Sequence, residues 1–135
     1  VTVLEGVNAR YLTVDDLPYR PTMVTCDVSF ISATLAAPPA LACAATGWDA
    51  LVLVKPQFEA ARRDAPKGVV RDPDVHRRAV TGVGQVLAEH ACLRTVVASP
   101  LRGPKGNREF FLHLAGTPPS LTAEQFRQAV DDAVD

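Results

Sequence analysis

The stretch ALVLVKP, residues 50–56, is a continuous apolar run that ends in a lysine and a proline. Apolar residues without polar alternation are typical of a strand buried on both faces, as in a parallel sheet covered by helices. A second such run, MVTCDVSF over residues 23–30, leads into an Ala- and Leu-rich stretch before residue 50. The two runs and the stretch between them predict strand, helix and parallel strand, the repeating unit of α/β folds.

Further strands and helices follow the same alternation. Short β-branched or aromatic runs predict three more strands, at Val1 to Leu4, Thr95 to Ala98 and Phe110 to Leu114. The stretch from Ile31 to Ala45 predicts a helix, which Pro38 and Pro39 should kink or split. The pattern therefore indicates a doubly wound α/β sheet.

Two later helices are marked by their first residues. Asp72 followed by Pro73 predicts a helix start, and the apolar face that follows reaches about Ala91. Thr122 and Gln125 have the spacing of a capping box, which predicts an amphipathic helix at the end of the chain.

Length and composition bound the possibilities. The chain has 135 residues, 47% hydrophobic and 21% charged, which fits one soluble domain over residues 1–135. Its longest weakly polar stretch, Leu35 to Ala45, is far shorter than the ~20 residues of a membrane-spanning helix. Three cysteines without a C-x-x-C pair predict reduced thiols in a cytoplasmic protein. A net charge of −1 means that any polyanion must be bound by a local cluster of basic residues.

Three ionisable residues flank the ends of predicted strands. Asp27 lies late in its strand, Lys55 directly follows the run LVLV, and Glu109 opens the strand that starts at Phe110. In open α/β sheets the ligand crevice lies beyond the carboxyl ends of the parallel strands. If the strand from Phe110 is antiparallel, Glu109 lies at this same edge, and the three groups converge there. Taken singly, each is more often an ordinary surface or capping residue.

Several motifs in the right order carry a family resemblance. They are DVSFIS (27–32), VKPQFEA (54–60), GVVRDPDVH (68–76), SPLRGPKGNREFFLHL (99–114) and the opening LEGVNARYLT (4–13). Together they resemble the hemolysin-A-type ribosomal RNA methyltransferases of the FtsJ-like group. Gly6 and Val7 depart from the family pattern in the opening segment.

The resemblance implies S-adenosylmethionine-dependent methylation of a ribose 2′-hydroxyl in rRNA. By motif, Asp27, Lys55 and Glu109 match three members of the family's Lys-Asp-Lys-Glu catalytic set. It also implies a cofactor side formed by Asn8, Asp27, Ser29 and Phe30. The first catalytic Lys, the Gly-rich cofactor loop, the acidic ribose-binding residue and the S4-like RNA-binding domain have no match here. We therefore expect the chain to be the carboxyl-terminal half of such an enzyme.

The unmatched lysine has a chemical consequence. Two carboxylates beside one ammonium favour its protonated form, which cannot accept a proton, and a second ammonium would offset this effect. We therefore expect little or no activity from this chain alone.

The resemblance also implies a partial Rossmann-like sheet that holds strands 3 to 7 of the family order 3-2-1-4-5-7-6. The strand from Met23 would then have an unpaired edge. Either residues Val1 to Leu4 cover this edge, or a second copy pairs there to form a homodimer, or the missing half of the enzyme completes it.

Basic residues in two Gly/Pro-rich loops are the candidate RNA contacts, since phosphate contacts fix the register of a protein on nucleic acid. They are Arg62, Arg63, Lys67, Arg71, Arg102, Lys105 and Arg108. Solvation alone explains them equally well. The histidines have no Cys or carboxylate at ligand spacing, so we expect no metal site.

Two functional hypotheses stay open. The first is an rRNA 2′-O-methyltransferase whose site is complete only in a longer protein. The second is a noncatalytic α/β module, derived from that family, that binds RNA or a protein through its exposed edge and basic loops.

Overall fold

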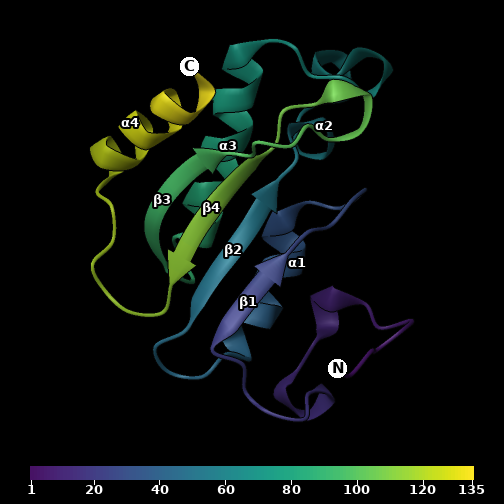
Figure 1. The fold of residues 1–135 in the computed structure, drawn as a ribbon, viewed down its shortest axis with the longest axis vertical. Coiled ribbons are helices and arrows are strands. Elements are labelled where there is room, and N and C mark those ends of the chain that lie inside the picture. Colours follow the sequence, from purple (N-terminus) through teal and green to yellow (C-terminus); the bar gives the residue numbers. More distant parts are fainter.

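The computed structural model describes residues 1–135 and contains one four-stranded mixed sheet (Figure 1). The sheet order is β1-β2-β4-β3, and the strands are β1 (Met23–Cys26), β2 (Asp49–Val54), β3 (Cys92–Ala98) and β4 (Phe110–Ala115). β1 and β2 are parallel, whereas β4 is antiparallel to both of its neighbours. This is the order expected for family strands 4, 5, 7 and 6, so the partial sheet is confirmed for these four strands.

The predicted strand at Val1 to Leu4 is not formed, and the prediction of five strands is wrong. These residues have no regular structure and are exposed, because no neighbouring strand pairs with them. β1 is consequently an edge strand, with β2 as its single partner. Met23, the first residue of this edge strand, is about half exposed.

Four α-helices connect and cover the strands: α1 (Ala33–Ala42), α2 (Pro56–Glu59), α3 (Pro73–Leu87) and α4 (Ala123–Val134). The predicted caps are present: Asp72 accepts a hydrogen bond at the start of α3, and Thr122 with Gln125 forms the capping box of α4. Pro38 and Pro39 do not split α1, which ends within one turn of them. No helix is both long and apolar enough to cross a bilayer.

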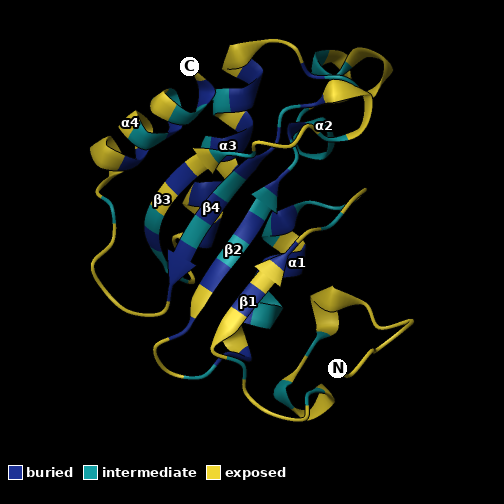
Figure 2. Cartoon of the chain, in the orientation of Figure 1, coloured by how far each residue is buried: buried dark blue, intermediate teal, exposed yellow.

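The long helices all cover one face of the sheet, and in Figure 1 α1 and α3 lie behind it. On this face Val52, Val54, Leu112 and Leu114 are fully buried in the core. The opposite face is open, and its strand residues are less buried, as the alternating colours of the strands in Figure 2 show. The expectation that the strands are buried on both faces is therefore wrong for this chain. The apolar run at residues 50–54 conceals this alternation because Leu51 and Leu53, on the open face, are apolar too.

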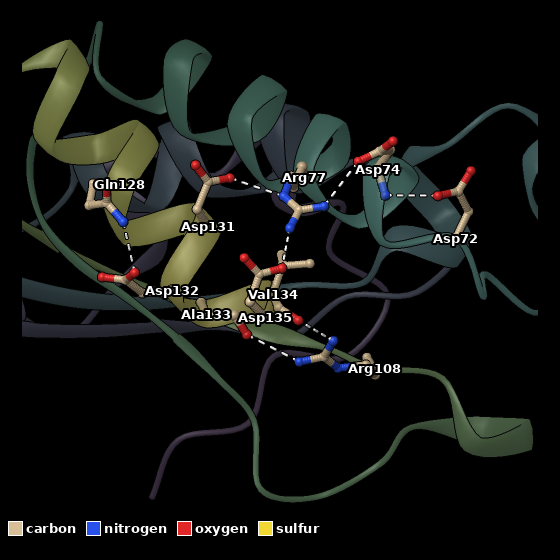
Figure 3. A network of polar contacts seen from close by, with 10 residues as sticks. All are labelled: Asp72, Asp74, Arg77, Arg108, Gln128, Asp131, Asp132, Ala133, Val134 and Asp135. Atoms are coloured by element: carbon tan, nitrogen blue, oxygen red, sulfur yellow. Dashed lines mark hydrogen bonds and ion pairs between the residues drawn. The ribbon is translucent and has the colours of Figure 1, made fainter.

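Two arginines hold the carboxyl-terminal helix α4 in place (Figure 3). Arg77 of α3 pairs with Asp131 and Asp135 of the terminal segment. Arg108, just before β4, donates to the backbone oxygens of Val134 at 2.6 Å and Ala133 at 3.1 Å. A guanidinium at a helix carboxyl end satisfies free carbonyls and offsets the negative end of the helix dipole.

Candidate functional site

The carboxyl ends of the two parallel strands bring Asp27 and Lys55 together. Lys55 follows the last residue of β2 and is the N-cap residue of α2, and its Nζ lies 2.5 Å from Oδ1 of Asp27. The same ammonium donates to Oγ of Ser29 at 3.2 Å. The Lys55 side chain is 13% exposed and the Asp27 side chain 66%, so the ammonium is largely covered while the carboxylate faces solvent. The pair is thus an ordered charge cluster at the mouth of the sheet.

Glu109 lies at the same edge of the sheet. The pairing of β2 with β4 places Val54 opposite Phe110, so Lys55 and Glu109 occupy the next positions along the two strands. Glu109 is 7% exposed, and its Oε1 accepts a hydrogen bond of 3.1 Å from Nε2 of Gln57. No ion pair joins Glu109 to Lys55. Glu109 is therefore held by Gln57 of α2, and Gln57 lies two residues after Lys55 in the sequence.

The predicted cofactor residues behave differently from one another. Ser29 contacts Lys55, as described above, whereas Phe30 is 90% exposed, has a positive φ of 63° and packs its ring 4.8 Å from that of Phe58. Asn8 caps a short 3₁₀ turn, where its side chain accepts a hydrogen bond from Arg10 N. No hydrogen bond joins Asn8 to Asp27, Ser29 or Phe30.

The loop after β1 is fixed from α2. Glu59 accepts hydrogen bonds from Ser32 Oγ at 2.7 Å and from the backbone N–H of Ala33 at 2.8 Å. This carboxylate therefore caps the start of α1, where negative charge is favourable. Burial raises the pKa of the neighbouring Cys26 thiol, as do the Asp27 and Glu59 carboxylates, while Lys55 opposes the shift. A thiol with a raised pKa is a poor nucleophile, so thiolate chemistry is not favoured here.

Two matching turns support the loop that precedes Glu109. Residues 66–68 and 104–106 both read Pro-Lys-Gly, and Lys67 and Lys105 have nearly equal positive φ values of 57° and 59°. Asn107, which is 2% exposed, joins the turns: its Nδ2 donates to Gly68 O at 2.9 Å and to Pro104 O at 3.0 Å. Its Oδ1 accepts from Val70 N at 3.0 Å. In Figure 1 the two loops lie side by side beyond α3.

The candidate RNA-binding residues fall into groups. Arg62 and Arg63 are exposed on one 3₁₀ turn, whereas Arg71, Arg102 and Lys105 surround a separate cavity. Lys67 is exposed, and its backbone oxygen accepts from Lys105 Nζ at 2.8 Å. Arg108 is tied to α4, so its guanidinium is partly committed within the chain.

Two residues that support the site were not singled out from the sequence. Gly103 packs directly against the Glu109 carboxylate, and Asn107 connects the twin turns. For Asn107, the sequence contained one clue: the tripeptide Pro-Lys-Gly occurs twice, at residues 66–68 and 104–106, and Asn107 directly follows the second copy.

The proposed catalytic residues do not line a main cavity of the chain: none of the five main cavities is lined by Asp27, Lys55 or Glu109. Sites for small molecules and cofactors are usually concave and bury most of the ligand. The residues present thus form at most one wall of a site for S-adenosylmethionine, and they do not fit that molecule on their own.

Residues 1–115 match the FtsJ-like methyltransferase family. This chain belongs to that family. The 16S/23S rRNA (cytidine-2′-O)-methyltransferase TlyA of Mycobacterium tuberculosis is 42% identical over 139 residues, covering 99% of this chain and 51% of TlyA. Hemolysin A of Brachyspira hyodysenteriae is 34% identical over 118 residues, covering 84% of this chain and 48% of that protein.

A solved structure agrees with the family assignment. A Lactococcus lactis protein described as a hemolysin superposes with a TM-score of 0.89 at 31% identity, covering 98% of this chain and 64% of that one. The chain spans about half the length of the curated relatives it matches. The membership and the fold are thus shown, while the activity of a whole relative concerns a longer protein.

Proposed function

We propose that this chain forms part of an enzyme that methylates a ribose 2′-hydroxyl in rRNA, with Asp27, Lys55 and Glu109 as its catalytic residues here. The 2.5 Å contact between Lys55 and Asp27, at the carboxyl ends of two parallel strands, is the observation that carries the proposal. The family and the name of the TlyA relative support it. S-adenosylmethionine would supply the methyl group, within a site that further residues complete.

The chemistry explains the residue types. A ribose hydroxyl is a weak nucleophile, so a positioned group must accept its proton as it attacks. In its protonated form Lys55 can orient a hydroxyl oxygen but cannot take its proton. A second cation beside Asp27 would compete for this carboxylate and favour release of the Lys55 proton. Glu109, buried beside Gln57, would accept hydrogen bonds and fix the reacting groups.

Activity assays test this proposal. We expect no turnover from the 135-residue chain incubated with labelled S-adenosylmethionine and ribosomal subunits, and clear turnover from a longer protein that joins it to the family's Gly-rich cofactor loop and first catalytic Lys. In that longer protein Lys55→Ala should lower the rate by about 100-fold or more, the range for loss of a general base. Glu89→Gln, an exposed change outside the site, is the control. Turnover by the short chain at the rate of the longer protein would refute the proposed incompleteness.

The proposed partner is rRNA in the cytoplasm, contacted by the exposed basic residues of the two loops. Self-association through the free edge of β1 is part of the same proposal, because an unpaired strand offers free N–H and C=O groups. Because Asp27 lines none of the five main cavities, the second hypothesis, a noncatalytic binding module, is the alternative to test. Calorimetric titration with S-adenosylmethionine separates the two for the longer protein.

A further inference from the structure

A cavity of about 250 Å³ lies between the start of α3 and the loop before β4. Four cationic side chains line it, and no carboxylate does: Arg71, Arg102, Lys105 and Arg108. His76, in the first turns of α3, completes the wall. The cavity is separate from Asp27 and Lys55, which do not line it. Its lining thus concentrates positive charge in a protein whose net charge is −1.

His76 is the most unusual member of this wall. It is 2% exposed, and neither ring nitrogen makes a hydrogen bond of full geometry, although the Val70 backbone lies within reach of the ring. Its ring packs 5.6 Å from that of Phe110, which holds it between the helix and the sheet. Buried polar groups in folded proteins nearly always have partners, so this ring, in the wall of the cavity, has hydrogen-bonding capacity left for a ligand atom.

The positive charge of the cavity is not neutralised within the chain. Arg71 and Arg102 take part in no ion pair, since the salt bridges of the chain involve other residues. Lys105 uses one of its three donors on Lys67 O, and Arg108 uses its terminal nitrogens on α4. The nearby carboxylates are occupied, because Asp72 caps α3 while Asp74 and Asp135 pair with Arg77.

We propose that this cavity binds a phosphate group, with Arg71 and Arg102 as the charged contacts and His76 as a buried hydrogen-bond donor. Guanidinium groups match the oxygens of phosphate, and several N–H donors around one anion form the strong class of hydrogen bond. The source of the phosphate is the rRNA backbone, a step that rests on the proposed function. The site would then fix the register of the RNA while Asp27 and Lys55 face the ribose.

The ionisation of His76 provides a specific reporter. Burial lowers the pKa of His76, and Arg108 and, more weakly, Arg102 lower it further, whereas the Val70 backbone and Asp72 oppose the shift. An anion in the cavity favours the protonated ring. Binding of phosphate should therefore raise the pKa of His76, and binding elsewhere on the surface should not.

Nitrogen NMR of the His76 ring in the 135-residue chain tests the site with sodium phosphate as the probe. We expect saturable shifts of both ring nitrogens and a rise in the pKa of His76. Arg71→Gln with Arg102→Gln should weaken phosphate binding by about tenfold or more, since each removes a charge-assisted hydrogen bond. Arg20→Gln with Arg127→Gln removes the same charge at exposed positions outside the cavity and should change binding less than about twofold. Unaltered His76 resonances, or equal losses in the two double variants, would overturn the site.

A second titration tests the source of the phosphate. A short single-stranded oligouridylate should shift the same ring resonances and compete with inorganic phosphate. Phosphate binding without such competition would overturn the assignment to RNA and leave a site for a free anion. Because neither readout measures methyl transfer, both are independent of whether the proposed enzymatic function holds.

Discussion

Gly103 lies directly against the carboxylate of Glu109, with no room between them for a methyl group. A Cβ at this position would overlap Oε1, the atom that accepts the hydrogen bond from Gln57. The missing side chain of Gly103 therefore leaves the space that the Glu109 carboxylate occupies at the mouth of the sheet.

Replacement of Gly103 should change the methylation rate more than the stability of the fold. In the longer protein we expect Gly103→Ala to move Glu109 and to lower the methylation rate by about 10- to 100-fold, because misplacement by ~1 Å can cost as much. The rate should be measured together with the urea midpoint. Full activity in a folded Gly103→Ala protein would mean that the position of Glu109 is unimportant.

Alanine at Gly82 and alanine at Gly84, both in α3, should have opposite effects on the free energy of unfolding. A Cβ at Gly82 meets nothing within 4 Å, so Gly82→Ala should raise the free energy of unfolding by up to about 1 kcal/mol through helix propensity. A Cβ at Gly84 would enter the ring of Phe126 in α4, so Gly84→Ala should lower it by about 1–3 kcal/mol. Urea unfolding of both variants measures the difference. Stabilisation by both would contradict the packing of α4 on α3.

Asn107 should dominate the stability of the twin turns. Asn107→Ala leaves Val70 N and Gly68 O without their partner, while Pro104 O keeps the hydrogen bond from the backbone N–H of residue 107, and we expect a loss of about 2–3 kcal/mol. Hydrogen exchange should show faster exchange of the Val70 amide in this variant. Asn107→Asp keeps an acceptor for Val70 N but loses both donated bonds, so it should protect that amide better than alanine does.

His76 should make stability depend on pH. Because its pKa is lowered in the folded chain, chiefly by burial, the unfolded chain binds a proton first as the pH falls below about 6.5. Stability should therefore decrease with falling pH over the interval between the unfolded and folded pKa values, in buffer free of phosphate. His76→Phe should reduce this slope, whereas His90→Gln, at an exposed position, should leave it unchanged. An equal slope in wild type and His76→Phe would rule out this origin.

The free edge of β1 predicts self-association. We expect sedimentation velocity to show dimers of the 135-residue chain at high concentration. Thr25→Lys, on the edge strand, should shift the population toward monomer because a charged edge opposes strand pairing. Thr46→Lys adds the same charge at an exposed turn and should not. A monomer at all concentrations would count against pairing at this edge.

Features encoded by neighbouring residues were predictable from the sequence. The cap at Asp72 and the capping box at Thr122 each involve no more than four consecutive residues, and each marks the start of a helix. The apolar runs at residues 50–54 and 110–114 match β2 and β4 closely. The meeting of Asp27 and Lys55 follows from two parallel strands that end at one edge.

Features that depend on distant partners were not predictable. A strand at Val1 to Leu4 needs a neighbour that the chain does not place there. The contact of Gly103 with Glu109, the bridge through Asn107 and the burial of His76 all arise from packing between loops far apart in sequence. The secondary-structure propensities of single residues contain no information about such packing.

Arg108 donates to the last carbonyls of α4 and directly precedes Glu109 in the sequence. It therefore connects the end of the chain to the segment that holds Glu109. Helix α4 lies outside residues 1–115, which match the family model, yet trimming its final turn would free the guanidinium that neighbours a catalytic candidate. An affinity tag or a proteolytic cut at that terminus is thus a perturbation of the strand edge where the chemistry is expected to occur.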